Sequence, residues 1–494
     1  MGSATPKFQA IIKVGYFFIR LRHEHSQQPN WRLIMNKVNA YIDAHLPEYI
    51  RILKHLCRQP SVSAEQSGLS EMANLVAETM QSLGIASEIL PSEGAPVVYG
   101  HLVGRNNRTV LLYNHYDVQP VDPLSEWQSP PFEPTERDGR LYARGVLDNK
   151  GDLLIRLAAV AALKATGQDL PLNIKFLVEG EEEVDGAAIY TFIRQHRDLL
   201  ACDLCFSEGG SLDANGRPGI YLGVKGMLYV ELEARGAAVD AHSSYAPVLP
   251  NPAWSLTWAL TCLKDHNGNI LIPGFYEHVS PWSARDRLAL AALPSDIENA
   301  LRDQTQLSTL LDGTQGMDFL RRLYSEPTCT ICGIHAGYNG PGVKTVLPAV
   351  ATAKLDFRLV PDQHPQDILD KLRVHLDASG FGGVLIRPLA KIGLPARTPI
   401  DNPLVQTVIE ITKQYYQADP IVIPMMAGGV VYEPFIHTLG APTMFGGISP
   451  TGGNIHAPNE YIEVSTLAPA IKFTAYLLQK LGETQQSPVG ASEI

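Results

Sequence analysis

Short apolar runs alternate with amphipathic segments between about residues 66 and 210. Three of the runs have the length and apolar character of buried strands, at 109–113, 173–178 and 202–206. Between them, apolar side chains recur at helical spacing over residues 151–166 and 186–200. Strands that alternate with helices in this way indicate an open α/β sheet.

The pattern changes after residue 212, and a segment marked by proline and glycine follows at 272–276. Residues 350–359 alternate between apolar and polar side chains, which predicts a half-buried antiparallel strand with one polar face. The other expected elements are a strand-rich stretch at 219–234, a helix at 251–264, a helix at 365–378 and a strand at 384–387. Together they predict a sheet that is covered by two helices.

The α/β pattern returns at about residue 390 and continues to a last helix at 464–481. The simplest layout has two domains, in which a smaller α+β domain interrupts an α/β domain. We place the larger domain at 35–214 and 389–494, and the inserted domain at 215–388. Residues 1–34 are interpreted as an N-terminal extension, and Met35 is an alternative start. The apolar run at 11–20 contains Lys13, and no signal-peptide cleavage site follows it.

The composition fits this layout and limits the classes of partner. With 494 residues, 45% hydrophobic and 18% charged, the chain is long enough for two globular domains. Its formal net charge of −11 argues against nucleic acid, which selects a basic face. No stretch approaches the roughly 20 apolar residues that cross a bilayer, so no membrane partner is expected. Six cysteines include two Cys-x-x-Cys pairs, which we interpret as reduced thiols in a cytoplasmic protein rather than a zinc site.

Acidic and histidine side chains follow each of the three expected strands. His115 and Asp117 follow the first strand, the glutamates at 181–183 follow the second, and Glu208 follows the third. Ligands of open α/β sheets bind just outside the carboxyl ends of the strands. Each group alone has an ordinary explanation, since a His-x-Asp pair can be structural and an acidic triplet is typical of a solvated helix start.

Two loops add further candidate ligands. Asp148 lies in a glycine-bounded loop that opens onto the expected helix at 151–166, and His456 lies in the loop at 452–460. Either loop alone could be a simple turn. Two histidines and three carboxylates nevertheless form a mixed nitrogen and oxygen set that suits zinc, manganese or cobalt. The combination of these segments, in this order and at strand ends, indicates a metal site.

These segments resemble the co-catalytic metallopeptidase family that includes carnosinases, bacterial dipeptidases, glutamate carboxypeptidases, aminoacylases and succinyl-diaminopimelate desuccinylases. The resemblance covers about residues 40–480. It implies a zinc-exopeptidase-like α/β catalytic domain with an inserted α+β, ferredoxin-like lid and dimerisation domain. It also implies a homodimer with two divalent metal ions in each subunit, with Zn²⁺ as the first choice and Mn²⁺ or Co²⁺ as alternatives.

The resemblance also implies a role for each residue of the motifs. The implied ligands are His115 and Glu208 for the first metal, Glu183 and His456 for the second, and Asp148 for both. Asp117 would orient the ring of His115, and Glu182 would be the general base. In this family the peptide bond after the bridging Asp148 is characteristically cis.

The reaction that the resemblance implies is hydrolysis of an amide bond in a small peptide or an N-acyl amino acid. Three carboxylates and a shared hydroxide would nearly neutralise the charge of two divalent ions, as burial requires. The metals would lower the pKa of the shared water toward ~7 and polarise the scissile carbonyl. Glu182 would then move the proton to the leaving amine. No serine or cysteine nucleophile is needed.

The inserted domain resembles the lid of the family at two places. Residues 240–244 match the segment whose histidine reaches a neighbouring subunit, which makes His242 a candidate oxyanion stabiliser and substrate ligand in trans. The alternative is a histidine on a surface loop. Thr345, in the segment 344–348, and Arg358 resemble the carnosinase-like clamp for the substrate carboxylate. For Arg358 the alternative is a solvated sheet face.

Two positions depart from the family pattern, and both concern the surroundings of the site. Asn149 replaces the second Asp that often follows the bridging Asp, and residues 425–429 lack the polar side chains that many relatives place near the substrate. The large insertion favours the carnosinase and bacterial dipeptidase branch, so the predicted function is a dipeptidase. The alternatives are an N-acyl amino acid deacylase or carboxypeptidase, and a catalytically inactive relative that uses the fold for binding or assembly.

Overall fold

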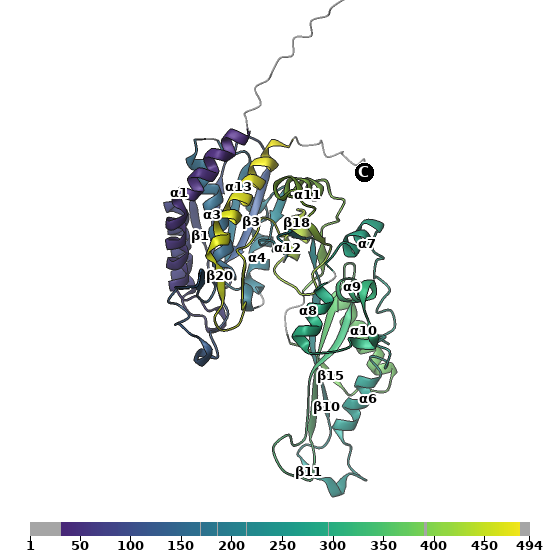
Figure 1. Cartoon of the computed structure of the whole chain (residues 1–494). Helices are drawn as coiled ribbons and strands as arrows, with labels where there is room; N and C mark the ends of the chain where they lie inside the picture. Colours follow the sequence, from purple (N-terminus) through teal and green to yellow (C-terminus); the bar gives the residue numbers. More distant parts are fainter. Residues whose placement is uncertain are drawn as a thin grey trace, which may run out of the picture.

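The larger domain is built on a six-stranded sheet (Figure 1). Its strands lie in the order β1 (Ser87–Leu90), β2 (Val97–Leu102), β6 (Asn173–Glu179), β3 (Thr109–His115), β7 (Leu204–Phe206) and β18 (Thr443–Met444). The last four are parallel to one another and include the three strands expected from the apolar runs. This computed structural model describes residues 31–484, apart from 168, 185, 214, 295 and 390–392.

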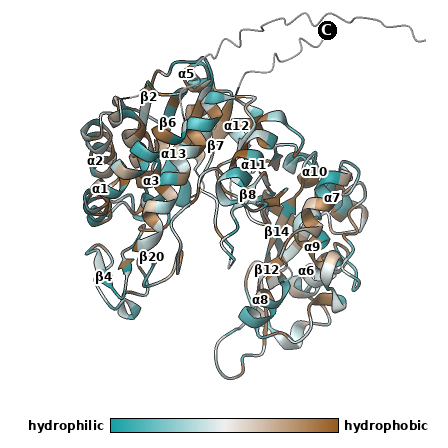
Figure 2. Ribbon diagram, turned by 45° about the horizontal axis from the view of Figure 1, so that its top comes forward, coloured by the Kyte–Doolittle hydropathy of each residue, from teal (hydrophilic) through white to brown (hydrophobic). Residues whose placement is uncertain are grey.

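Helices cover both faces of this sheet, because its strands direct apolar side chains alternately to either side. One face carries α1 (Trp31–Arg58), α2 (Leu69–Ser82), α3 (Lys150–Ala165) and α13 (Leu467–Glu483), which Figure 2 shows together. The other face carries α4 (Ala187–Gln195) and α12 (Glu433–His437). On β3, Val110 and Leu112 belong to the core of the first face, and Leu111 and Tyr113 to that of the second. The helix expected at 186–200 is interrupted at His196, after which α5 (Arg197–Leu200) begins.

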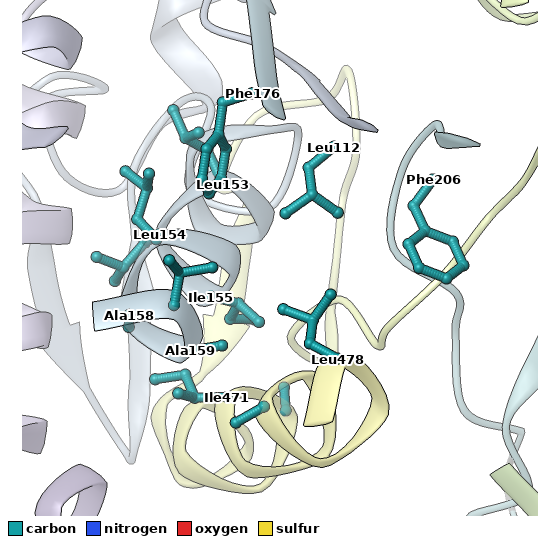
Figure 3. Packing of buried hydrophobic residues seen from close by; sticks show 14 of the residues in the cluster. Leu112, Leu153, Leu154, Ile155, Ala158, Ala159, Phe176, Phe206, Ile471 and Leu478 are labelled. Atoms are coloured by element: carbon teal, nitrogen blue, oxygen red, sulfur yellow. The ribbon is translucent and has the colours of Figure 1, made fainter. Parts of the chain in front are cut away.

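The helix α3 lies between the sheet and its neighbours α1 and α13. Figure 3 shows Leu153, Leu154 and Ile155 of this helix beside Leu112 of β3 and Leu478 of α13. The sequence predicted a helix with one wide apolar face, whereas all residues from 150 to 163 are buried. The charged residues at its start therefore need partners inside the protein.

The smaller domain contains an antiparallel four-stranded sheet in the order β12 (Thr328–Ala336), β14 (Val350–Leu359), β10 (Gly226–Arg235) and β15 (Leu385–Pro388). The helices α6 (Pro252–Thr261) and α10 (Pro365–Ala378) share its core. The strand expected at 350–359 and the helix expected at 365–378 are present with those bounds. Alternate residues of β14 are buried against the helices, and the polar residues lie on the other face. The α+β lid is confirmed, and the domain boundaries drawn from the sequence stay predictions.

A helical segment between α6 and β12 joins the two domains. It contains α7 (Ala284–Ala291), α8 (Asp296–Thr305) and α9 (Gly316–Ser325). Leu290 and Leu293 pack with Ile421 of β17 (Ile421–Ile423). β17 pairs with β8 (Gly219–Tyr221), whose Ile220 belongs to the core of the larger domain. The lid is thus attached to the larger domain by this segment as well as by its two chain crossings.

A second small sheet brings two loops of the larger domain together. Its strands lie in the order β19 (Gly452–Gly453), β20 (Tyr461–Glu463), β5 (Arg140–Tyr142) and β4 (Thr135–Arg137). Because β20 pairs with β5, the loop before β20 lies beside the loop after β5. These are the loops of His456 and Asp148. The sequence gives no sign of this pairing.

The first described helix, α1, begins inside the expected N-terminal extension. Residues 31–34 are helical, and Ile34 is buried in the core. Residues 1–30, which include the apolar run at 11–20, lie outside the described residues. Among the helices that are described, none is both long and apolar enough to cross a membrane.

Candidate metal centre

The candidate ligands follow the carboxyl ends of parallel strands. His115 is the last residue of β3 and lies in register with Glu179, the last residue of β6. Glu182 and Glu183 form a short 3-10 helix directly after β6, and Glu208 follows β7 by two residues. Parallel strands have their carboxyl ends at the same edge of a sheet, so this arrangement gathers residues that are distant in the sequence.

Asp148 lies between the two histidines. Its Oδ1 atom is 3.0 Å from His115 Nε2, and its Oδ2 atom is 3.1 Å from His456 Nε2. His456 Nε2 is also 3.1 Å from Glu183 Oε2. Ligand atoms of Asp148, Glu183 and His456 all lie within 4.8 Å of one another. Glu208 lies outside this trio, although the charges of His115 and Asp148 act on it.

These distances fit metal ions. Two atoms that each lie about 2.0 Å from one tetrahedral zinc ion are about 3.3 Å apart. The separations between Asp148 and the two imidazoles are close to this value. Each carboxylate oxygen of Asp148 faces a different histidine, which is the arrangement that a bridging carboxylate needs. The residues at this edge could therefore hold two divalent ions with Asp148 between them.

The cluster concentrates carboxylates in a place that is poor in water. Burial raises the pKa of Glu208 to about 7. Burial also holds the pKa of Glu182 well above its usual range, and the charges of Glu208, Glu183 and Asp148 add to the effect. The site therefore resists carrying its full negative charge unless positive charge is present.

The two histidines can supply positive charge to this cluster. Hydrogen bonds to Asp148 and Glu183 raise the pKa of His456 to about 10. Burial acts to lower the pKa of His115, but hydrogen bonds to Asp117 and Asp148 outweigh it and hold the pKa well above the usual range. Protonated imidazoles thus neutralise the carboxylates at the place where cations could bind.

Asp117 connects His115 with the loop of the candidate base. Its side chain is fully buried, and Oδ1 lies 3.2 Å from His115 Nδ1. The two carboxylate oxygens also accept the backbone N–H groups of Glu182 and Glu183, at 3.3 and 3.1 Å. A proton on Nδ1 leaves Nε2 of His115 free to face a metal. Asp117 therefore positions both the imidazole and the residues that follow β6.

Glu460 holds the loop of Asp148, and its importance was missed in the sequence. This buried carboxylate accepts the side chain of Arg144 at 2.9 Å and the backbone N–H of Asp148 at 3.0 Å. It also accepts the backbone N–H groups of Gly145 and Leu147. Because Glu460 follows His456 by four residues, one carboxylate fixes both loops. The peptide bond that follows Asp148 is cis, as the family resemblance implies.

A second buried network lies below the cluster, at the start of α3. The amide of Asn114 donates to the side chains of Asn149 and Asp152. Asp152 also accepts the backbone N–H of Gly209 at 2.9 Å, next to Glu208. Asn149 departs from the family pattern, and here its oxygen is used as an acceptor. The charged residues of α3 therefore support the loops that carry Asp148 and Glu208.

A pocket of about 270 Å³ lies between the two domains, with Glu182 in its wall. Arg358 of β14 also lines it, so the structure brings these two predicted residues to one pocket. Arg358 Nε donates to Asp356 at 3.0 Å. The segment at 425–429 reaches the same pocket through Gly429, which contributes no side chain to the wall.

His242 and Thr345 lie at another place. They are adjacent in the small sheet of β11 (Ala241–His242) and β13 (Val346–Leu347), where His242 Nε2 is 3.3 Å from Thr345 Oγ1. Both side chains are exposed. Figure 1 places β11 at the end of the lid away from the larger domain. The described chain therefore does not bring them to Glu182.

Comparison with known proteins identifies one family. The sequence profile of peptidase family M20/M25/M40 matches residues 111–480. A Beta-Ala-His dipeptidase of Homo sapiens is 32% identical over 364 residues, which are 70% of this chain and 71% of that protein. A Cys-Gly metallodipeptidase of Schizosaccharomyces pombe is 27% identical over 366 residues, 70% of this chain and 76% of that protein. The crystal structure of an M20 family metallo-carboxypeptidase from Sulfolobus solfataricus has a TM-score of 0.82 at 38% identity, covering 88% of this chain and all of that one.

The substitution Glu460→Gln is expected to lower the affinity for Zn²⁺ about 10- to 100-fold, because an amide cannot accept all of the N–H groups that fix the loop of Asp148. Competition with a chromophoric chelator measures this affinity. Glu463→Gln is the matched control, since Glu463 is half-exposed and, in the part of the chain that the structure describes, its side chain is paired with Arg140 alone, at 3.1 Å. Unchanged affinity in Glu460→Gln would show that this carboxylate does not position the site.

Proposed function

The chain belongs to peptidase family M20/M25/M40, and we propose that it is a dipeptidase of this family that uses two divalent metal ions. The observation that carries the proposal is the position of Asp148, whose two oxygens face His115 and His456 separately. Relatives that are named as Beta-Ala-His and Cys-Gly dipeptidases support the substrate class.

In this proposal each metal has ligands on more than one strand or loop. His115, Glu208 and Asp148 would hold the first ion, and Asp148, Glu183 and His456 would hold the second. Zinc is the proposed metal because it prefers mixed nitrogen and oxygen ligands, and manganese or cobalt would accept the same set. When bound, the ions acidify water and polarise the scissile carbonyl.

The side chains of the protein supply the proton transfer and the orientation of the substrate. Glu182 lines the pocket, where burial raises its pKa, so that the carboxyl can take a proton and return it to the leaving amine. Asp117 fixes this loop through the backbone N–H groups of Glu182 and Glu183. Within the described residues, Arg358 donates through Nε to Asp356, and its remaining guanidinium N–H groups can bind the carboxylate of a peptide. The pocket is small enough to suit a single amino-acid residue as the leaving group of the peptide.

We propose further that two chains form a homodimer through the lid. His242 is exposed at the tip of the lid, where only a second chain could bring it to an active site. Trp254 and Trp258 are also exposed on α6, with ring centroids 5.7 Å apart. Ile331 and Ile334 are exposed on β12, the edge strand of the lid sheet. Large apolar side chains gathered on one surface are typical of an interface.

The proposed location is the cytoplasm. All six cysteines are unpaired, as expected in a reducing compartment.

A second candidate activity is that of a carboxypeptidase, which the name of the solved Sulfolobus solfataricus relative favours. An N-acyl amino acid deacylase would use the same groups. The presence of all the metal ligands and of Glu182 argues against an inactive binding relative.

Unblocked dipeptides are expected to be hydrolysed by the metal-reconstituted protein with a kcat/KM at least about tenfold above that for N-acetyl or N-succinyl amino acids. Chromatography of the released amino acid, with Zn²⁺ or Mn²⁺ present, provides the measurement. Turnover of the acylated compounds alone would contradict a dipeptidase. Equal turnover of longer peptides with free carboxylates would favour the carboxypeptidase.

The substitution Glu182→Gln is expected to lower kcat about 10²- to 10⁴-fold, because the amide cannot accept the proton of the attacking water. Metal content, measured by elemental analysis, should stay unchanged. Glu181→Gln removes the charge of the adjacent residue and serves as the control, with activity near that of the wild type. If Glu182→Gln retained most of the activity, another residue would be the base.

His242→Ala and Glu182→Gln are each expected to be inactive, whereas a mixture of the two should recover about a quarter of wild-type activity. In a random mixture half of the dimers are mixed, and one of their two sites has both intact residues. Activity is measured after the variants have been dissociated and reassembled together. Activity no higher than that of the separate variants would contradict the role of His242 in trans.

A further inference from the structure

The pocket beside Glu182 contains two cationic side chains, Lys225 and Arg358. They differ in how their charge is compensated. Arg358 is paired with Asp356, whose carboxylate lies 3.0 Å from its Nε. Lys225 instead donates to two backbone carbonyls, those of Leu323 at 2.8 Å and Glu326 at 2.7 Å. No carboxylate among the described residues is paired with Lys225.

The ammonium of Lys225 is buried without a counter-ion. The residue is only 4% exposed, and a buried charge is unfavourable unless an opposite charge compensates it. Burial lowers the pKa of Lys225 to about 8, with a further contribution from the charge of Arg358. The two carbonyls lie at the end of α9 and use two of the three N–H groups. The third N–H has no acceptor within the described part of the chain.

Lys225 and Arg358 line the same pocket, and Gly429 lies beside both. A Cβ atom at Gly429 would be 3.3 Å from the carbonyl oxygen of Lys225 and 3.9 Å from Arg358 Nη1. The glycine thus keeps room for a ligand beside both residues. The same pocket is also lined by the aliphatic side chains of Met227 and Leu394. This combination suits a ligand with methylene groups and two separate carboxylates.

We infer that this pocket selects peptides whose C-terminal residue is glutamate or aspartate. The inference rests on the proposed function, in which Arg358 binds the main-chain carboxylate of the leaving residue. Lys225 then binds the carboxylate of its side chain, and Met227 and Leu394 contact the methylene groups. The bound residue supplies the negative charge that Lys225 otherwise lacks. An isosteric glutamine fits the same space but leaves the ammonium uncompensated.

Ala-Glu and Ala-Gln are the substrates that test this, because they differ in charge and hardly in shape. The wild type should have a kcat/KM at least about tenfold higher for Ala-Glu. Lys225→Met should abolish the difference, chiefly by raising KM for Ala-Glu, and Lys225→Arg should retain it. Lys354→Met is the control, since Lys354 is exposed on β14 and does not line the pocket.

A purely structural role for Lys225, as a brace for α9, predicts a different result. Lys225→Met would then weaken both substrates equally and leave their ratio unchanged, which would overturn the inference. A wild-type ratio near one would also overturn it, whether or not Lys225→Met folds.

Failure of the proposed function can be distinguished from failure of this inference. If the wild type hydrolyses no dipeptide, the proposed function is wrong, and the pocket is tested by binding alone. Calorimetry of the metal-loaded protein then compares free glutamate with free glutamine. Tighter binding of glutamate by the wild type and equal binding by Lys225→Met would support the inference. Equal binding by the wild type would overturn it.

Discussion

The accumulation of carboxylates at one edge of the central sheet is the constraint on which the rest of the structure depends. Asp148, Glu182, Glu183 and Glu208 converge there, and burial raises the pKa values of Glu182 and Glu208. Such a cluster is stable only if cations or protons neutralise it and if its loops cannot move apart. Protonation of the two histidines, whose pKa values are raised by their carboxylate partners, fulfils the first condition. The same positions would be neutral ligands once divalent ions replace those protons.

The second condition is fulfilled by residues that are themselves buried and charged. Glu460 joins the loops of Asp148 and His456 through the backbone, and Asp117 does the same for His115 and the loop after β6. Asp152 reaches the loop of Glu208 from the start of α3. Each support is a carboxylate that accepts backbone N–H groups, which fixes position more firmly than contact between flexible side chains. The interior of the larger domain thus contains buried polar residues that hold the loops of the site in place.

The sequence predicted the fold well where one pattern determines an element. The strand at 350–359 follows from strict alternation, and the strands after 109 and 173 follow from apolar runs with a ligand at the end. The supporting residues could not be predicted in this way, because the roles of Glu460 and Asp152 depend on hydrogen bonds to residues that are distant in the chain. One signal was available: Asp152 and Arg156 interrupt a helix that is otherwise apolar on all sides. Charged residues in such a helix indicate a buried network, although the sequence alone does not identify its members. The roles of the ligands themselves stay predictions that rest on their convergence.

The two domains contribute opposite charges to the pocket between them. The larger domain contributes the clustered carboxylates, whereas Lys225, which directly precedes β10, and Arg358 of β14 lie on the side of the lid. A peptide with two free ends carries an ammonium group at one end and a carboxylate at the other. It can therefore bind with its ammonium group toward the clustered carboxylates and its carboxylate toward Lys225 and Arg358. An acyl group at the amino end removes the positive charge of the substrate, so one of the two interactions that orient the substrate is lost. The same argument explains why the lid, which holds no ligand of the metal cluster, can still determine which peptide is cleaved. In the proposed function, selection by charge at the far end of the substrate would place the scissile bond next to Glu182 without a close fit around every side chain.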